Sequence, residues 1–324
     1  MRKVSKILIL CLILILIVSC GKSKNNKKIR IVLDWVPNTN HTGLYVAKDL
    51  GYFKEEGVDV EIVQPPEGST TALIGAGGAE FGISFQDTLA KSFAKENPVP
   101  VTAVAAILQH NTSGIISLKE KGIDSPKKLE GKRYATWEDD IEQAILKKLV
   151  TDNGGDFSKV KLIPYTVTNV VASLKTNIDA IWVYYAWDGI ATERAGLKTN
   201  FLKLRDYGKE LDYYSPVIIA NNDYLKANPE IAKKVLRAIK KGYEYATKNP
   251  EESAKILVKN SPELDINLVT ASQKWISKEY QADAKEWGII DGNRWNVFYE
   301  WLYKNKAVER EIPKDFGYSN EYLK

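Results

Sequence analysis

Cysteine and histidine are scarce in this chain, with two residues of each among 324. Cys11 and Cys20 both fall within the first twenty positions, so the rest of the chain has no thiol for a disulfide, a metal ligand or a nucleophile. The two histidines, His41 and His110, are too few for the common His-rich zinc motifs, and the string HExxH is absent. These absences argue against a cysteine enzyme, a disulfide-rich domain and the common classes of zinc protein.

Three loop motifs that carry common enzyme chemistry are also missing. There is no GxGxxG after the first predicted strand, no GxxxxGK[ST] loop and no GxSxG elbow. The string GAGG at residues 75–78 stands between a predicted helix and a predicted strand, which is the wrong order for a dinucleotide-binding loop. The formal charge is only +5, and three of the positive charges lie in the first six residues. We therefore expect no nucleotide-binding enzyme, no hydrolase with a common triad and no nucleic-acid partner.

The first nineteen residues differ from the rest of the chain. A basic start, MRKVSK, is followed by the apolar run ILILCLILILIV and then by Ser19 and Cys20. A run of about a dozen apolar residues is shorter than the ~20 that a membrane-spanning helix needs, and a small residue before cysteine is typical of a bacterial lipoprotein signal. The pattern predicts a signal peptide over residues 1–19, a lipidated Cys20 and a polar tether over residues 20–28. The protein would then be extracytoplasmic and lipid-anchored to the cell membrane; an uncleaved membrane anchor is the alternative.

From residue 29 onward, strand patterns alternate with helical ones. The predicted strands form two groups, at residues 28–35, 58–64, 79–85 and 99–108, and at residues 112–118, 132–137, 160–166 and 178–185. Alternating strands and helices are typical of parallel α/β sheets. We expect two α/β blocks, the second inserted into the first, and a helical C-terminal tail whose tryptophans pack in the core.

Polar and aromatic residues gather where four of these strands end. The four corners are Asp34, Trp35, Asn38, His41 and Thr42; Ser84, Phe85 and Gln86; Thr136, Trp137 and Glu138; and Tyr184, Tyr185, Trp187 and Asp188. In open α/β sheets, ligands bind outside the carboxyl ends of the strands and at helix N-termini. Aromatic faces from two blocks would hold a flat ring between them, and a carboxylate and amides would select for its nitrogen atoms.

Each corner also has a purely structural interpretation. Trp35 could cap a core, since tryptophan is usually largely buried, and Trp137 could pack between the blocks. Four polar residues could serve only as turn, cap or helix-start residues: Asn38, His41, Thr42 and Gln86. The fourth corner is the hardest to explain in this way, because Tyr, Tyr and Trp within four positions, followed by a carboxylate, exceed what the end of a core strand requires.

The first corner also carries a family resemblance. The string LDWVPNTNHTGLYVAKDLGYFKEEGVDVEIVQP resembles the thiamine-pyrimidine-precursor binding proteins of bacterial ABC importers, a superfamily that includes the fungal pyrimidine synthase for thiamine. The resemblance extends from about residue 29 to at least residue 250 and includes LIGAGGAEFGIS and IDAIWVYYAWDGI. It implies an α/β, two-lobed periplasmic-binding-protein type II fold with two crossover strands and a helical C-terminal tail. On that fold we expect residues 29–112 plus 216–324 to form lobe 1 and residues 113–215 to form lobe 2.

The resemblance implies that a small aromatic pyrimidine, formylaminopyrimidine or hydroxymethylpyrimidine, is captured between the lobes and delivered to an ABC permease and ATPase complex. Trp35 and Asn38 match ligand-facing positions of the family, and Tyr185, Trp187 and Asp188 match its second-lobe wall. Family members often have glutamate where this chain has Asp188, and related proteins bind other flat heterocycles such as riboflavin, which is the alternative ligand. We expect the binding protein to be a monomer.

An enzyme of pyrimidine synthesis is the competing hypothesis. The synthases carry a cofactor-binding lysine and a histidine in the stretch that aligns with GISFQDT, where this chain has Ser84 and Thr88. They also have a Cys-rich segment that is absent here. Because a Schiff base needs an amine, we expect neither an enzyme nor a cofactor. A third, weaker hypothesis is a lipoprotein with a structural role alone.

Overall fold

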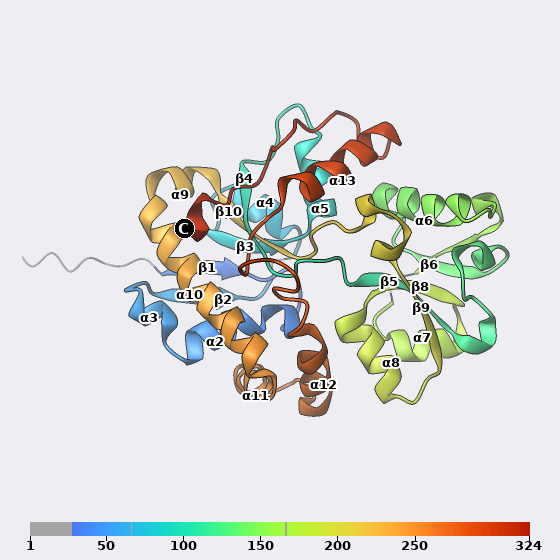
Figure 1. Ribbon diagram of the computed structural model, residues 1–324, viewed down its shortest axis with the longest axis horizontal. Helices are drawn as coiled ribbons and strands as arrows, with labels where there is room; N and C mark the ends of the chain where they lie inside the picture. Colours follow the sequence, from blue (N-terminus) through green and yellow to red (C-terminus); the bar gives the residue numbers. More distant parts are fainter. Residues whose placement is uncertain (1–27, 66, 166) are drawn as a thin grey trace, which may run out of the picture.

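The computed structural model describes residues 28–65, 67–165 and 167–324. The predicted signal peptide, Cys20 and all but the last residue of the predicted tether lie outside the described residues. Two five-stranded sheets, each covered by helices, form two lobes that stand side by side (Figure 1). In the part of the chain that the structure describes, no helix is long and apolar enough to cross a membrane.

The first sheet has the strand order β2-β1-β3-β10-β4. Its strands are β1 (Ile29–Val32), β2 (Val60–Val63), β3 (Phe81–Ser84), β4 (Val101–Ala106) and β10 (Val217–Asn221). β1 is parallel to β2 and β3, whereas β10 is antiparallel to β3 and β4. Helices on both faces explain why all four residues of β3 are buried and why these strands are rich in apolar residues.

The second sheet repeats this plan with the order β7-β6-β8-β5-β9. Its strands are β5 (Ser113–Leu118), β6 (Arg133–Thr136), β7 (Lys161–Pro164), β8 (Ala180–Tyr184) and β9 (Thr199–Lys203). β6 is parallel to β7 and β8, and β5 is antiparallel to β8 and β9. The chain passes between the sheets twice, from β4 to β5 and from β9 to β10, so the strands of the second sheet all come from a segment that lies between two strands of the first.

Helices cover both sheets. Those beside the first sheet are α2 (Thr42–Asp49), α3 (Tyr52–Glu55), α4 (Thr70–Gly75), α5 (Gln86–Phe93), α9 (Asn222–Ala227), α10 (Pro229–Lys248), α11 (Pro250–Asn260), α12 (Ile266–Ile276) and α13 (Gly292–Lys304). Those beside the second are α6 (Asp140–Asp152), α7 (Val170–Thr176) and α8 (Ile190–Arg194). The short 3-10 and π turns are η1 (Thr39–His41), η2 (Lys119–Lys121), η3 (Pro126–Leu129), η4 (Phe157–Lys159), η5 (Tyr185–Gly189), η6 (Leu204–Tyr207), η7 (Lys209–Leu211) and η8 (Glu321–Leu323).

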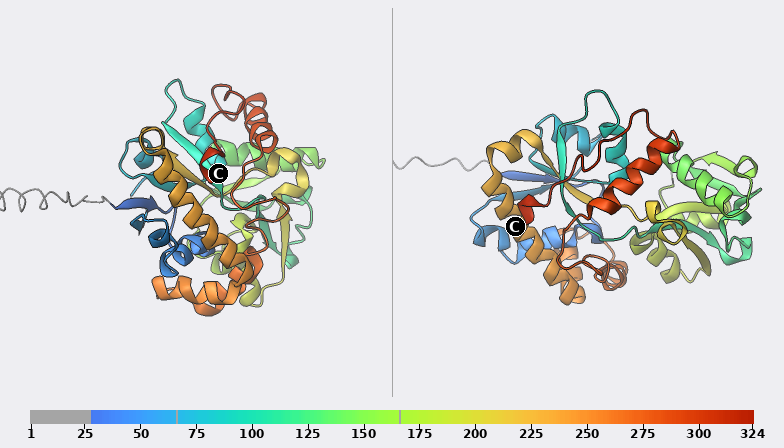
Figure 2. Two further views of the ribbon diagram at one scale, coloured as in Figure 1. Left: turned by 60° about the vertical axis from the view of Figure 1, so that its left-hand side comes forward. Right: turned by 45° about the horizontal axis from the view of Figure 1, so that its top comes forward.

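The helical C-terminal region belongs mainly to the first lobe. α10 packs against α2 and α3, and the C-terminus lies on this lobe in all views (Figures 1 and 2). Trp287 and Trp295 are buried as expected, while Trp275 and Trp301 are partly buried against the core. α12 also contacts η1 of the first lobe and η5 and α8 of the second. The C-terminal region therefore supports both sides of the junction between the lobes.

Candidate functional site

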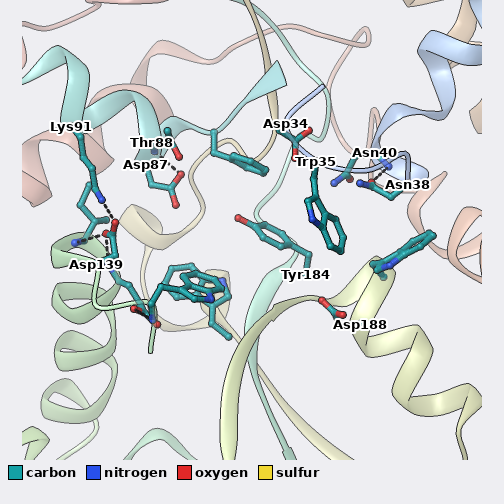
Figure 3. A pocket seen from close by; sticks show the side chains of 16 residues that line it. Asp34, Trp35, Asn38, Asn40, Asp87, Thr88, Lys91, Asp139, Tyr184 and Asp188 are labelled. Atoms are coloured by element: carbon teal, nitrogen blue, oxygen red, sulfur yellow. Dashed lines mark hydrogen bonds and ion pairs between the residues drawn. The ribbon is translucent and has the colours of Figure 1, made fainter. Parts of the chain in front are cut away.

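A cavity of about 370 Å³ lies between the lobes, at the carboxyl ends of β1, β3, β6 and β8 (Figure 3). Lobe 1 contributes Asp34, Trp35, Asn38, Asn40, Phe85, Asp87, Thr88 and Lys91, and lobe 2 contributes Trp137, Asp139, Ile141, Glu142, Trp182, Tyr184, Trp187 and Asp188. Each of the four corners singled out in the sequence supplies part of this wall. The volume lies within the range of small-molecule sites, which is roughly 300–1,000 Å³.

The first corner is held in shape by its own polar side chains. The Asn38 Oδ1 accepts a hydrogen bond from the Asn40 N–H (2.9 Å), and the His41 Nδ1 accepts one from the Asn38 N–H (3.2 Å). The His41 Nε2 lies 2.7 Å from the Asp34 Oδ1. These bonds close η1 as a reciprocal cap and turn the chain into α2. As a result, Trp35 extends from the corner with 52% of its surface exposed, and the structure does not show it capping a core.

His41 and Thr42 do not line the cavity. Both are fully buried, because His41 joins the turn to Asp34 and Thr42 starts α2 against the core. The expectation that His41 and Thr42 face the ligand is corrected. Both residues instead support the turn and the start of the helix, as in their purely structural interpretation. Asn38 does reach the wall, although its side chain also donates to the Val36 carbonyl (3.0 Å).

Gln86, in the second corner, does not line the cavity, although its neighbours do. Gln86 is fully buried; its Nε2 donates to the Trp295 carbonyl and its Oε1 accepts from the Tyr214 N–H, both at 2.8 Å. The prediction that Gln86 lies at the ligand is therefore corrected, because both ends of its amide connect α5 to distant backbone. Phe85, Asp87, Thr88 and Lys91 take its place on the wall.

Sequence reasoning missed Asp87, Thr88 and Lys91 as wall residues. Thr88 and Lys91 are three positions apart on α5, so they share a helix face, and this spacing could have indicated them. The Asp87 carboxylate accepts from the Thr88 N–H (2.8 Å) and from the Tyr213 hydroxyl (3.4 Å), and burial raises its pKa. The Lys91 ammonium pairs with Asp139 at the start of α6, which forms an ion pair between the lobes.

The third corner presents Trp137 to the cavity with 49% of its surface exposed, so the structure does not show the alternative in which it packs buried between the lobes. Its ring lies against Trp182, with centroids 5.8 Å apart. The Glu142 carboxylate accepts hydrogen bonds from the Trp137 N–H (2.9 Å), the Thr136 hydroxyl (2.8 Å) and the Tyr134 hydroxyl (3.0 Å). Burial raises the pKa of Glu142.

In the fourth corner, Tyr184 rather than Tyr185 faces the cavity together with Trp187 and Asp188. The expectation for Tyr185 is corrected: its hydroxyl donates to Glu193, and its ring packs 4.6 Å from Phe201 and 5.2 Å from Trp275. Successive side chains at a strand end point to opposite faces, so only one of the two tyrosines can face the cavity.

Asp188 is a carboxylate without a local partner. Among the described residues no hydrogen bond or ion pair to its side chain is found, and burial raises its pKa to about 6. It lies on the same side of the cavity as Trp35 and Asn38 (Figure 3). An unpaired, desolvated carboxylate at such a position can accept hydrogen bonds from a ligand.

The described part of the cavity wall is predominantly acidic. It carries five carboxylates against one lysine, and that lysine is paired with Asp139. This balance favours a ligand that is rich in hydrogen-bond donors or positively charged. Among the described residues, no group of three or more His, Cys, Asp or Glu side chains is arranged to hold a metal ion.

Comparison with known proteins agrees with this geometry. Residues 38–253 match the model of the family described as NMT1/THI5 like, and the chain belongs to that family. It is 27% identical over 326 aligned residues to the formylaminopyrimidine-binding protein of Halalkalibacterium halodurans, covering 97% of this chain and 98% of that protein. It is also 27% identical to the 4-amino-5-hydroxymethyl-2-methylpyrimidine phosphate synthase of Legionella pneumophila, covering 93% and 94% of the two chains. The family resemblance predicted from the sequence is confirmed.

Proteins of known structure share this fold. The crystal structure of the periplasmic aliphatic sulphonate binding protein SsuA from Escherichia coli superimposes with a TM-score of 0.70 at 14% identity, covering 92% of this chain and 99% of that one. At that identity the likeness concerns the fold alone. It confirms the predicted two-lobed periplasmic-binding-protein fold.

Proposed function

We propose that this protein is the substrate-binding protein of an ABC importer and that it captures a thiamine-related aminopyrimidine between its lobes. The observation that carries the proposal is Asp188, an unpaired carboxylate on a cavity wall that also bears Trp35 and Trp187. A flat heterocycle with an amino group offers a ring for the tryptophans and a donor for the carboxylate. The near full-length similarity to a formylaminopyrimidine-binding protein supports the same ligand class.

Binding would proceed by closure of the lobes around the ring. Trp35 of lobe 1 and Trp187 of lobe 2 would sandwich it, and each stacking contact contributes about 0.5–1.5 kcal/mol beyond burial of area. Asp188 would accept a hydrogen bond from the amino group, and Asn38 and Asn40 would contact the ring nitrogens. A hydrogen bond to a charged group is worth roughly 1.5–3 kcal/mol, so a ring without the donor would leave Asp188 unpaired and bind poorly.

The proposal includes lipid anchoring at Cys20 outside the cytoplasm and delivery to a permease and ATPase. The direction of β1 supports this arrangement. Asp34 and Trp35 follow the carboxyl end of β1 and line the cavity, so Ile29 starts the strand at the end that points away from the site. A chain leading to a membrane anchor from that end would leave the ligand entrance free.

We propose a binding role rather than synthase activity, although synthases are among the relatives. Ser84 is buried and shares a hydrogen bond with the Thr71 hydroxyl (2.8 Å), so this position offers no amine. The lysine on the described cavity wall is Lys91, whose ammonium is paired with Asp139. When pyridoxal phosphate is mixed with the protein, the absorbance spectrum of the pyridoxal phosphate should stay unchanged. A Schiff-base band on the protein would contradict the binding role.

Ligand identity can be tested by calorimetric or tryptophan-fluorescence titration with formylaminopyrimidine, hydroxymethylpyrimidine, thiamine and riboflavin. We expect binding of the aminopyrimidine compounds. Riboflavin is the alternative flat heterocycle, and binding of riboflavin alone would replace the ligand class while keeping the transport role. If none of the three aminopyrimidine compounds bound, the ligand proposal would be rejected.

Trp35→Ala should weaken aminopyrimidine binding by at least about tenfold, because it removes one face of the proposed sandwich. Val36→Ala is the matched control: Val36 is the next residue, is 46% exposed and does not line the cavity. Its affinity should equal that of the wild type in the same titration. Unchanged binding by Trp35→Ala would remove Trp35 from the site.

A further inference from the structure

The cavity has aromatic rings on two sides. In Figure 3, Trp35, Asn38 and Asp188 lie on one side, Lys91 and Asp139 lie on the other, and the Tyr184 ring is between them. Trp137 precedes Asp139 by two residues and lines the same cavity, so it belongs to the Lys91 side. The proposed aminopyrimidine position between Trp35 and Trp187 leaves this second side unused.

Trp137 is firmly positioned even though its ring is half exposed. Its backbone N–H donates to Glu142, and the same carboxylate fixes the preceding strand through Thr136 and Tyr134. The buried Trp182 packs against the ring, with centroids 5.8 Å apart. A rigid, exposed aromatic surface inside a cavity is typical of a ligand contact, because an aromatic ring that serves only the core would be buried.

The partition between the two sides is also aromatic. Phe85 of lobe 1 and Tyr184 of lobe 2 pack with their ring centroids 5.6 Å apart. Stacked rings require centroid separations of roughly 4.5–7 Å. Because Tyr184 lies between Trp35 and the Lys91 side of the cavity (Figure 3), a single ring that stacks on Trp35 leaves the Trp137 side free.

We propose that Trp137, with Thr88 and Lys91 at its edge, forms a second subsite for a second flat ring. The ligands of this cavity would then be two-ring compounds in which an aminopyrimidine is joined by a short linker to another heterocycle. This inference rests on the proposed function, which places the first ring. Because the face of an indole is negative and the described wall carries five carboxylates against one paired lysine, an electron-poor or cationic second ring fits best.

Two probes that share one pyrimidine test this subsite. Thiamine carries a cationic thiazolium ring on the methylene group where hydroxymethylpyrimidine carries a hydroxyl. We expect the wild-type protein to bind thiamine at least about tenfold more tightly than hydroxymethylpyrimidine in calorimetric titrations. Trp137→Ala should abolish this advantage, weakening thiamine about tenfold and hydroxymethylpyrimidine less than about twofold. Trp137→Phe should retain part of the advantage, because it keeps a ring.

Trp35→Ala is the control for the first ring and should weaken both probes. Because Trp137 is half exposed, its variants should melt near the wild-type temperature, which thermal unfolding will check. Thiamine binding no tighter than hydroxymethylpyrimidine, or an equal loss of both in Trp137→Ala, would overturn the second subsite alone. Failure of both probes to bind the wild type would overturn the second subsite, and the proposed ligand class would fall with it only if formylaminopyrimidine also failed to bind.

Discussion

At the scale of single residues, Asp188 connects the stability of the protein to its proposed activity. Its pKa is raised by burial from 3.8 to about 6, so near neutral pH the folded protein holds a charge that would be better solvated in the unfolded chain. A ligand that donates a hydrogen bond to this carboxylate would stabilise the ionised form of Asp188. The residue is therefore expected to favour binding while it disfavours the ligand-free fold.

Asp188→Asn should separate these two effects. Aminopyrimidine affinity should fall about tenfold or more near neutral pH, because the charged acceptor is lost. The ligand-free protein should become more stable by roughly 1–3 kcal/mol, which corresponds to a pKa difference of about two units. Since the folded pKa is raised, this gain is largest above about pH 6 and shrinks as the pH falls from about 6 toward 3.8.

Chemical denaturation across this pH range, together with titrations at neutral pH, measures both effects. Asp59→Asn is the control, because Asp59 is exposed and lies outside the cavity wall. It should change neither affinity nor stability appreciably. A ligand-free Asp188→Asn protein that is less stable than the wild type at neutral pH would show that the Asp188 carboxylate has a stabilising partner.

At the scale of the elements, the first corner depends on how closely α2 packs against α10. A side chain at Gly43 would overlap the Tyr243 ring, and one at Gly242 would overlap the Gly43 carbonyl. Tyr243 stacks on Trp287, with centroids 4.5 Å apart, and its hydroxyl donates to the Asn40 carbonyl (2.7 Å). The spacing of the two helices is thus linked to the position of a cavity residue.

Gly43→Ala should destabilise the protein by about 1–3 kcal/mol, because the added methyl group must displace Tyr243 or separate the helices. It should also weaken aminopyrimidine binding, since Asn40 loses its support. Lys48→Ala is the matched control, an exposed position on the same helix that should be nearly neutral. Denaturant unfolding and titration provide the two measurements; wild-type stability in Gly43→Ala would mean that α2 can shift without cost.

Much at this scale follows from local sequence patterns. Ser and Asp are favoured at helix N-caps, and Ser69 and Asp139 cap α4 and α6 in this way. The ends of four strands indicate where the cavity lies. The role of Gln86 could not be predicted, because its partners are 209 and 128 residues away along the chain. The choice between Tyr184 and Tyr185 depended on which way a single residue faces where β8 ends, and neighbouring tyrosines give no pattern that decides it.

At the scale of the whole molecule, His110 lies where the lobes are joined. It belongs to the first crossover; its Nδ1 is 2.7 Å from the Asp212 Oδ2 in the second crossover, and its Nε2 is 2.9 Å from the Asp283 Oδ1 in the C-terminal region. Arg294 lies 3.7 Å from Asp212, and Arg205 pairs nearby with Glu279 (2.9 Å). One imidazole thus connects three chain segments at the hinge.

The hydrogen bond to Asp212, supported by Asp283, raises the pKa of His110 above 6.5, although burial and Arg294 act in the opposite direction. For a histidine with a raised folded pKa, the added stability is fully present below 6.5 and is lost as the pH rises through the folded pKa. This pH range lies above the range in which Asp188 titrates. The two groups can therefore be distinguished by pH.

His110→Gln should remove this dependence. At about pH 6 the variant should be less stable than the wild type by roughly 1–3 kcal/mol, because hydrogen bonds to a charged group are lost, and the two unfolding free energies should converge as the pH is raised. Asp283→Asn should give a smaller change of the same sign, since Asp283 is largely exposed. Denaturant unfolding at several pH values measures this convergence. Parallel curves for wild type and His110→Gln would mean that the hinge does not depend on the charge of His110.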